Sequence, residues 1–226
     1  MQKIKAILFD LDNTLIDFIQ MKEEACKAAV QAMIAAGLNM DVKEAYTRLM
    51  QTYFAVGLES DTAFTQFLRE IGQFNHKIRA AAINGYLKAK TNFVKPYPDV
   101  ELVLQKLHKK GIVLVIVTDA PKTKAYQRLL MMGIEPYFKF VVGFEDTNNT
   151  KQTGLPLMLT LDILKKETPD ITNSEILMVG DSITRDLAPA RKFGLKTALA
   201  KYGQREKENG ITDYELVTIH DLIKIV

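Results

Sequence analysis

The chain has 226 residues, of which 47% are hydrophobic, enough to fill the core of one α/β domain that also carries a smaller insertion. Lys and Arg number 30 against 27 for Asp and Glu, and this mild net charge of +3, without a long basic run, gives no reason to expect a nucleic-acid partner. A single cysteine, Cys26, excludes an internal disulfide framework, and the longest apolar run, "IVLVIV", is far shorter than the roughly 20 residues that span a membrane. We therefore expect a soluble, cytoplasmic protein with no membrane partner.

Six short β-branched runs predict the strands of one sheet. Most of these runs are apolar on both faces, which favours a parallel sheet covered by helices on both sides. From the second run onward a helical segment separates each strand from the next, as the crossovers of a parallel sheet require. We expect a Rossmann-like α/β core. The six runs are residues 4–9, 112–117, 138–143, 175–180, 196–200 and 214–219.

The first crossover is much longer than the others. Between the strand that ends at Phe9 and the helix that starts near Pro98 lie about 80 residues with no convincing strand, far more than a crossover needs. Apolar residues there recur at three and four positions, which predicts a bundle of four helices. We predict a catalytic core formed by residues 1–16 and 96–226 and a helical cap domain at 17–95. The four predicted helices lie within residues 23–37, 42–57, 61–72 and 76–93.

Polar side chains follow the first four predicted strands. In a parallel sheet these strand ends meet at one edge, where ligands bind. Several carboxylates at one edge repel one another, which raises their pKa values or demands a cation. Because the ligands are oxygens and no His or Cys is near them, we expect that cation to be Mg²⁺. The residues concerned are Asp10, Asp12, Thr118, Asp119, Lys151, Asp181, Ser182 and Asp186.

An anion beside carboxylates and Mg²⁺ suggests phosphoryl transfer. Thr118 and Lys151 would bind the anionic group of a small phosphorylated molecule, Lys151 as a point charge. Asp10 would attack phosphorus to form an aspartyl phosphate. Asp12 would protonate the leaving oxygen and then deprotonate the attacking water. Mg²⁺ and Lys151 would neutralise the charge that develops on the phosphoryl oxygens.

The order and spacing of these residues resemble the four motifs of the haloacid dehalogenase-like hydrolase superfamily. The motifs are the run Asp10 to Thr14, then Thr118, then a lysine, then Gly180-Asp181-Ser182 with Asp186. The resemblance implies that Asp10 is the nucleophile and that Asp12 is the acid/base, whose backbone carbonyl also binds Mg²⁺. It further implies that Thr118 and Lys151 hold phosphate, that Asp181 binds the metal directly, and that Asp186 supports the site.

Three further residues are expected to cap the N-termini of helices that begin beside the site. Ser182 and Asp186 would cap the helix that follows them, whose N-terminus also favours an anion. Asp119 would do the same for the helix that starts near Pro121, beside the substrate phosphate.

Two departures from the family pattern stand out. The third motif usually reads Lys-Pro, whereas here "NNTKQTGLP" delays the proline to Pro156. Lys151 remains the candidate, with Lys122 and Lys124 as substitutes that could reach the same edge. Asn13 stands where glycine is common, and asparagine tolerates a tight turn.

The leading hypothesis is an Mg²⁺-dependent phosphomonoesterase. A phosphomutase of the same capped family shares the four motifs and stays open. Asp12 argues against a haloacid dehalogenase, because those enzymes lack this second aspartate and need no metal. A receiver domain would carry its phosphorylated aspartate after the third strand rather than after the first. A non-catalytic binding protein would be expected to have lost one of the carboxylates, and all are present.

The inserted helices resemble the mobile cap that selects the substrate in this family. In length and in the run "AVQAMIAAGL" they resemble archaeal members assigned as glyceraldehyde 3-phosphate phosphatases. The physiological substrate, the residues of the cap that contact it, and the choice between monomer and homodimer are not specified by the sequence.

Overall fold

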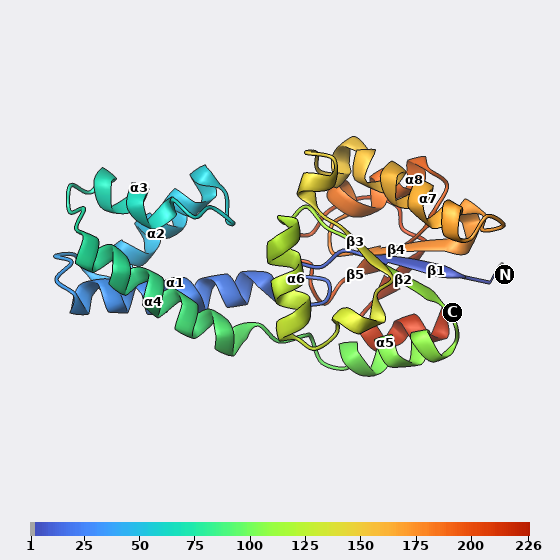
Figure 1. Cartoon of the computed structure of the whole chain (residues 1–226), viewed down its shortest axis with the longest axis horizontal. Coiled ribbons are helices and arrows are strands. Elements are labelled where there is room, and N and C mark those ends of the chain that lie inside the picture. Colours follow the sequence, from blue (N-terminus) through green and yellow to red (C-terminus); the bar gives the residue numbers. More distant parts are fainter. Residues whose placement is uncertain (1–2) are drawn as a thin grey trace. The chain divides into compact units, whose positions relative to one another are not determined.

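The computed structural model describes residues 3–226, which divide into two compact units. The first unit contains the chain up to Asp17 together with Lys95–Val226, and the second is Phe18–Val94. Figure 1 shows a sheet covered by helices in the first unit and helices alone in the second.

Six parallel strands form the sheet within residues 3–226, in the order β3-β2-β1-β4-β5-β6. The direction in which strands are added reverses between β1 and β4, so the carboxyl ends of these two strands flank a topological switch point. All six predicted strands are present, and the prediction of a Rossmann-like parallel sheet is confirmed. The strands are β1 (Ala6–Phe9), β2 (Val113–Val117), β3 (Phe140–Val142), β4 (Ile176–Gly180), β5 (Lys196–Ala200) and β6 (Tyr214–Leu216).

Helices cover both faces of the sheet, because the strands are apolar on both sides. Leu8 of β1 joins a buried cluster with Leu157 and Leu161 of α7 and with Leu187 beside α8. Its neighbour Phe9 points the other way, as alternate residues of a strand must. On the opposite face lie α5 and the 3₁₀ turn η6, which contact each other (Figure 1). The helices of this unit are α5 (Val100–Lys109), α6 (Lys122–Met131), α7 (Leu155–Glu167) and α8 (Ala188–Lys192), and η6 is Ile219–Lys224.

The second unit is a bundle of four helices, as predicted. Its core includes Cys26, Leu49 and Phe67, none of which is exposed. Burial raises the pKa of the Cys26 thiol to about 11. No helix among the described residues has both the length and the apolar character that crossing a bilayer requires. The helices are α1 (Phe18–Ala35), α2 (Val42–Val56), α3 (Ala63–Glu70) and α4 (His76–Phe93).

Gly85 allows α1 and α4 to approach each other closely. A Cβ atom at this position would lie 2.7 Å from the carbonyl oxygen of Ala28 and 2.9 Å from the Cβ atom of Ala32. We expect Gly85→Ala to lower the free energy of unfolding measured in urea. The steric cost of about 1–3 kcal/mol exceeds the roughly 1 kcal/mol that alanine gains over glycine in a helix. Asn84→Ala, at the exposed neighbouring position, should instead stabilise slightly, and equal stabilisation by both changes would contradict the close contact.

Candidate active site

Three buried carboxylates gather at the carboxyl ends of β1 and β4. Asp10 follows β1 directly and Asp181 follows β4, while Asp186 comes from the π-helical turn Ile183–Leu187 (η5). Their exposed fractions are 5%, 5% and 1%. One carboxylate oxygen from each residue lies within 4.8 Å of those from the other two. The structure thus brings together residues that lie more than 170 positions apart in the sequence.

The turn after β1 orients Asp10. Asn13 adopts a left-handed conformation with φ of 59°, which asparagine tolerates. This bend lets the backbone N–H of Leu15 donate to the carbonyl oxygen of Leu11 at 2.9 Å. The hydroxyl of Thr14 then lies 3.5 Å from Oδ2 of Asp10 and donates to it. The tight turn that was expected at Asn13 is present.

Lys151 reaches into the carboxylate cluster. Its Nζ donates to Oδ1 of Asp10 and to the carbonyl oxygen of Val117 at 3.3 Å, and it lies 2.8 Å from Oδ1 of Asp186. Lys122, a proposed substitute, instead binds Asp146 at 2.8 Å. Of these two lysines, Lys151 is therefore the one in contact with Asp10.

The loop that carries Lys151 is held by Asp119. Oδ1 of Asp119 accepts the backbone N–H of Lys151 at 2.8 Å. The expectation that Asp119 caps the next helix is wrong, because α6 has Pro121 at its N-cap and no side-chain cap bond. The delayed Pro156 lies in the first turn of α7, where a missing N–H costs nothing. The remodelled third motif is thus a 3₁₀ turn, Lys151–Thr153, followed by a new helix start.

Thr118 and Ser182 stabilise the two loops on either side of Asp10. Oγ1 of Thr118, a buried group, accepts the N–H of Ala120 at 3.1 Å and keeps its own proton to donate to an anion. Oγ of Ser182 accepts the N–H of Arg185 at 3.1 Å, which makes Ser182 the expected helix cap. The N–H of Ser182 donates to Oδ2 of Asp186 at 3.1 Å. Ser182 therefore fixes the position of Asp186.

The cluster holds more negative charge than its cations offset. Burial raises the pKa of Asp10 well above its ordinary value; Lys151 opposes this shift, and Asp186 and Asp181 add to it. Burial and then repulsion by Asp186 raise the pKa of Asp181 to about 7, although Arg185 lies 3.4 Å from both of its oxygens. Burial alone would lower the pKa of Lys151, but the charges of Asp10 and Asp186 raise it above its ordinary value. A further cation would relieve this repulsion.

The donor set suits a hard divalent cation. Among residues 3–226 this is the single group of three or more His, Cys, Asp or Glu side chains close enough to hold a metal ion. It offers carboxylate oxygens only, which are the ligands that Mg²⁺ prefers. Asp10, Asp181 and Asp186 would hold such an ion. The group is defined by side-chain oxygens, so the expected binding of Mg²⁺ by the backbone carbonyl of Asp12 stays a prediction.

Asp12 is instead bound by an arginine that the sequence analysis did not single out. Nη1 of Arg128, a residue of α6 that is 1% exposed, lies 3.1 Å from Oδ2 of Asp12. Arginine on an amphipathic helix is ordinarily solvated, so no local pattern distinguishes Arg128 from its neighbours. Its burial arises from contact with a loop 116 positions earlier in the chain.

The contact predicts that Arg128 orients the side chain of Asp12, the residue expected to act as acid/base. Arg128→Met should lower kcat by about 10- to 100-fold, because the ion pair that helps to orient the Asp12 side chain is lost. The fold should survive, because the Asp12 side chain is 21% exposed and its charge stays partly hydrated, while methionine fills the space of the arginine stem. The measurement is steady-state phosphate release, with Arg191→Met, which changes a half-exposed arginine of the same unit, as the control. Equal activity of the two variants would contradict the orienting role.

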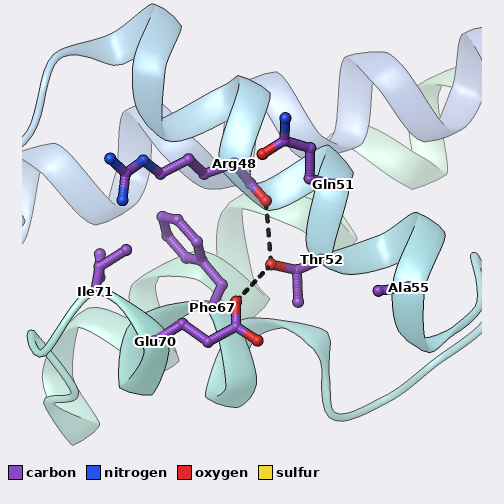
Figure 2. A pocket seen from close by; sticks show the side chains of 7 residues that line it. All are labelled: Arg48, Gln51, Thr52, Ala55, Phe67, Glu70 and Ile71. Carbon is purple, nitrogen blue, oxygen red and sulfur yellow. Dashed lines mark hydrogen bonds between the residues drawn. The ribbon is translucent and has the colours of Figure 1, made fainter.

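A separate pocket lies within the helical unit (Figure 2). The hydroxyl of Thr52 donates to the carbonyl oxygen of Arg48 at 3.0 Å and to Oε2 of Glu70 at 3.3 Å. Gln66 donates to the other oxygen of Glu70 at 2.9 Å. The hydrogen bonds of these polar groups are made among themselves. None of the candidate catalytic or metal-binding residues lines this pocket.

The fold and the site together define a Rossmann-like α/β protein with an acidic, oxygen-rich centre at the switch point of its parallel sheet. The profile of the family described as haloacid dehalogenase-like hydrolase matches residues 7–200. The chain is 31% identical to the glyceraldehyde 3-phosphate phosphatase of Methanocaldococcus jannaschii, over 99% of this chain and 97% of the relative. It is 27% identical to the phosphoglycolate phosphatase of Aquifex aeolicus, over 99% of this chain and 97% of the relative.

A solved structure described as a putative β-phosphoglucomutase from Thermotoga maritima has the same fold. The TM-score is 0.74 at 18% identity, over 99% of this chain and all of the other. The chain belongs to the haloacid dehalogenase-like hydrolase family. The predicted family membership is confirmed, as is the prediction of an enzyme in the branch whose curated relatives are named phosphatases.

Proposed function

We propose that the protein is an Mg²⁺-dependent phosphomonoesterase that forms an aspartyl phosphate on Asp10. The observation that carries the proposal is the contact of Lys151 with Asp10 inside a buried group of carboxylates. This arrangement sets a nucleophile next to a positive charge and next to ligands for a hard cation. Mg²⁺, held by Asp10, Asp181 and Asp186, would neutralise charge on the transferring phosphoryl group.

The residues of the chain divide the reaction into two displacements. Thr118 and Lys151 hold the phosphoryl oxygens while a carboxylate oxygen of Asp10 attacks phosphorus and the bond to the leaving oxygen breaks. Asp12 gives its proton to that leaving oxygen. Water then attacks the same phosphorus, Asp12 takes a proton from it, and the bond to Asp10 breaks. Inorganic phosphate leaves, and the carboxylate of Asp10 is restored.

The substrate proposed is a small phosphate ester of two or three carbons. The named relatives support this size, since glyceraldehyde 3-phosphate and phosphoglycolate are of this kind. The helical unit Phe18–Val94 is proposed as the domain that selects among such esters. A reducing compartment such as the cytoplasm suits the one buried cysteine.

The test combines catalysis with chemical trapping. The parent enzyme should release phosphate from p-nitrophenyl phosphate with Mg²⁺ and not with EDTA, and a comparison of kcat/KM across small phosphate esters identifies the preferred one. Acid quenching with a 32P-labelled substrate should leave protein-bound label that hydroxylamine removes, since an acyl phosphate reacts with it. Label that persists in Asp10→Asn, or activity that survives EDTA, would overturn the proposal. Activation by a sugar bisphosphate would indicate a phosphomutase instead.

A further inference from the structure

A segment after β5 fastens together the loops that carry the candidate catalytic carboxylates. This segment, residues 202–210, is called the strap here. One of its ends contacts the turn after β1, and the other contacts the loop after β4. The strap contains no candidate residue of the sequence analysis, and its role is not explained by the reaction steps above.

The first end of the strap holds the turn after β1. The hydroxyl of Tyr202 donates to the carbonyl oxygen of Thr14 at 2.8 Å. A Cβ atom at Gly203 would overlap the carbonyl oxygen of Asn13, so only glycine permits this approach of two backbones. Nη2 of Arg205 pairs with Oδ1 of Asp17. The turn that carries Asp10 and Asp12 is therefore held from outside the sheet.

The second end of the strap holds the loop after β4 through Glu208. Oε1 of Glu208 accepts the hydroxyl of Ser182 at 2.7 Å. Its Oε2 accepts both the N–H and the hydroxyl of Thr184, each at 2.7 Å. Hydrogen bonds to a charged carboxylate are stronger than those between neutral groups. Glu208 thus fixes the two residues that flank the start of the π-helical turn.

The contacts of Glu208 lead directly to the acidic cluster. Ser182 lies next to Asp181 in the chain, and its N–H donates to Oδ2 of Asp186 at 3.1 Å. A shift of the Ser182 backbone would therefore move both carboxylates. Residues hydrogen-bonded directly to metal ligands commonly change metal affinity about 10- to 100-fold when removed, and Glu208 acts one contact further away, through Ser182.

We propose that the strap is a positioning element and that Glu208 is its positioning residue, which holds Asp181 and Asp186 at the separation that a divalent cation requires. The inference rests on the Mg²⁺ site of the proposed function. It assigns Glu208 no contact with substrate or metal; the residue acts through Ser182 and Thr184.

Titration calorimetry of Mg²⁺ into the full-length protein, without substrate, tests this role. Glu208→Ala should raise the Kd for Mg²⁺ about 10-fold, the lower end of the range for partners of metal ligands, because it acts through Ser182. Glu208→Gln retains one acceptor oxygen and should raise it less. Glu206→Ala removes the same charge from an exposed position of the strap and should leave Kd unchanged. Thermal unfolding in EDTA, which a purely structural role would alter, should be alike for Glu208→Gln and Glu206→Ala.

The outcomes separate the inference from the proposed function. If the parent protein binds Mg²⁺ and both Glu208 variants bind it equally well, the positioning role is wrong while the Mg²⁺ site stands. A lower melting temperature with an unchanged Kd would likewise make Glu208 structural and overturn the proposal. If the parent protein itself binds no Mg²⁺, the metal site fails, and the inference fails with it. Should Glu208→Ala not fold, Glu208→Gln decides by the same measurement.

Discussion

Replacement of Asp10 by asparagine is expected to lower kcat by about 10⁴-fold or more, because an amide oxygen is a poor nucleophile. The variant should still fold, since Asp186 remains 2.8 Å from Nζ of Lys151 and balances its charge. Burial raises the pKa of Asp10, which means that the ionised carboxylate is held unfavourably. The variant should therefore melt no lower than the parent, and the activity loss should not reflect unfolding. The measurements are kcat for p-nitrophenyl phosphate and the melting temperature in EDTA.

The matched control is Asp162→Asn on the exposed surface of α7, which should leave both quantities unchanged. Retention of a tenth or more of the parent kcat by Asp10→Asn would contradict its role as nucleophile. A large fall in melting temperature would show that Asp10 contributes to stability more than its burial and its neighbours suggest.

Replacement of Lys151 by methionine is expected to impair both stability and catalysis. The replacement removes the ammonium that Asp10 and Asp186 share and leaves the two carboxylates buried without it. The free energy of unfolding should fall by about 3–5 kcal/mol. The loss of its charge from the transferring phosphoryl group should lower kcat by about 10²- to 10³-fold. Urea unfolding in EDTA measures the first effect and steady-state kinetics the second. Added Mg²⁺ should stabilise this variant more than the parent, because in the proposed metal site it would bind the carboxylates that have lost the ammonium.

Lys122→Met provides the control for Lys151. Lys122 is another lysine that could have filled the third motif, and it pairs with Asp146 at a partly exposed site. Its replacement should change stability by about 1 kcal/mol or less. If Lys122→Met lost more activity than Lys151→Met, Lys122 and not Lys151 would be the lysine of the third motif.

The sheet and the position of the site were predictable because their signals are local. Each strand is a short apolar run, and Asp10 and Asp181 stand at the first polar positions after two of these runs. Parallel strands place such positions at one edge, so knowledge of the strand ends sufficed to bring the two residues together. The four helices of the insertion follow from three- and four-residue spacing in the same way.

The contacts that Arg128 and Glu208 make with distant segments of the chain were not predictable. Arg128 resembles the solvated residues of its helix, and nothing in the sequence around it indicates its ion pair with Asp12. Glu208 lies in a polar loop, 26 positions from Ser182. The helix expected after Ser182 begins as a π-helical turn and becomes α8 only at Ala188, next to Pro189, which has no N–H to donate. Local patterns describe which elements form, but not which charges these elements enclose.

The entry and the exit of the inserted helices are fastened to each other within the core unit. Ile16, just before the insertion, forms an antiparallel bridge with Pro96, just after it, and the N–H of Tyr97 donates to the carbonyl oxygen of Leu15 at 2.9 Å. The insertion therefore behaves as a closed loop whose length hardly affects the chain on either side, because closure entropy grows only slowly with loop length. Modules of different size can be exchanged at this junction without disturbing β1 or the residues that follow it. In the proposed function, new substrate preferences would arise in the exchanged unit while the chemistry at Asp10 is inherited unchanged.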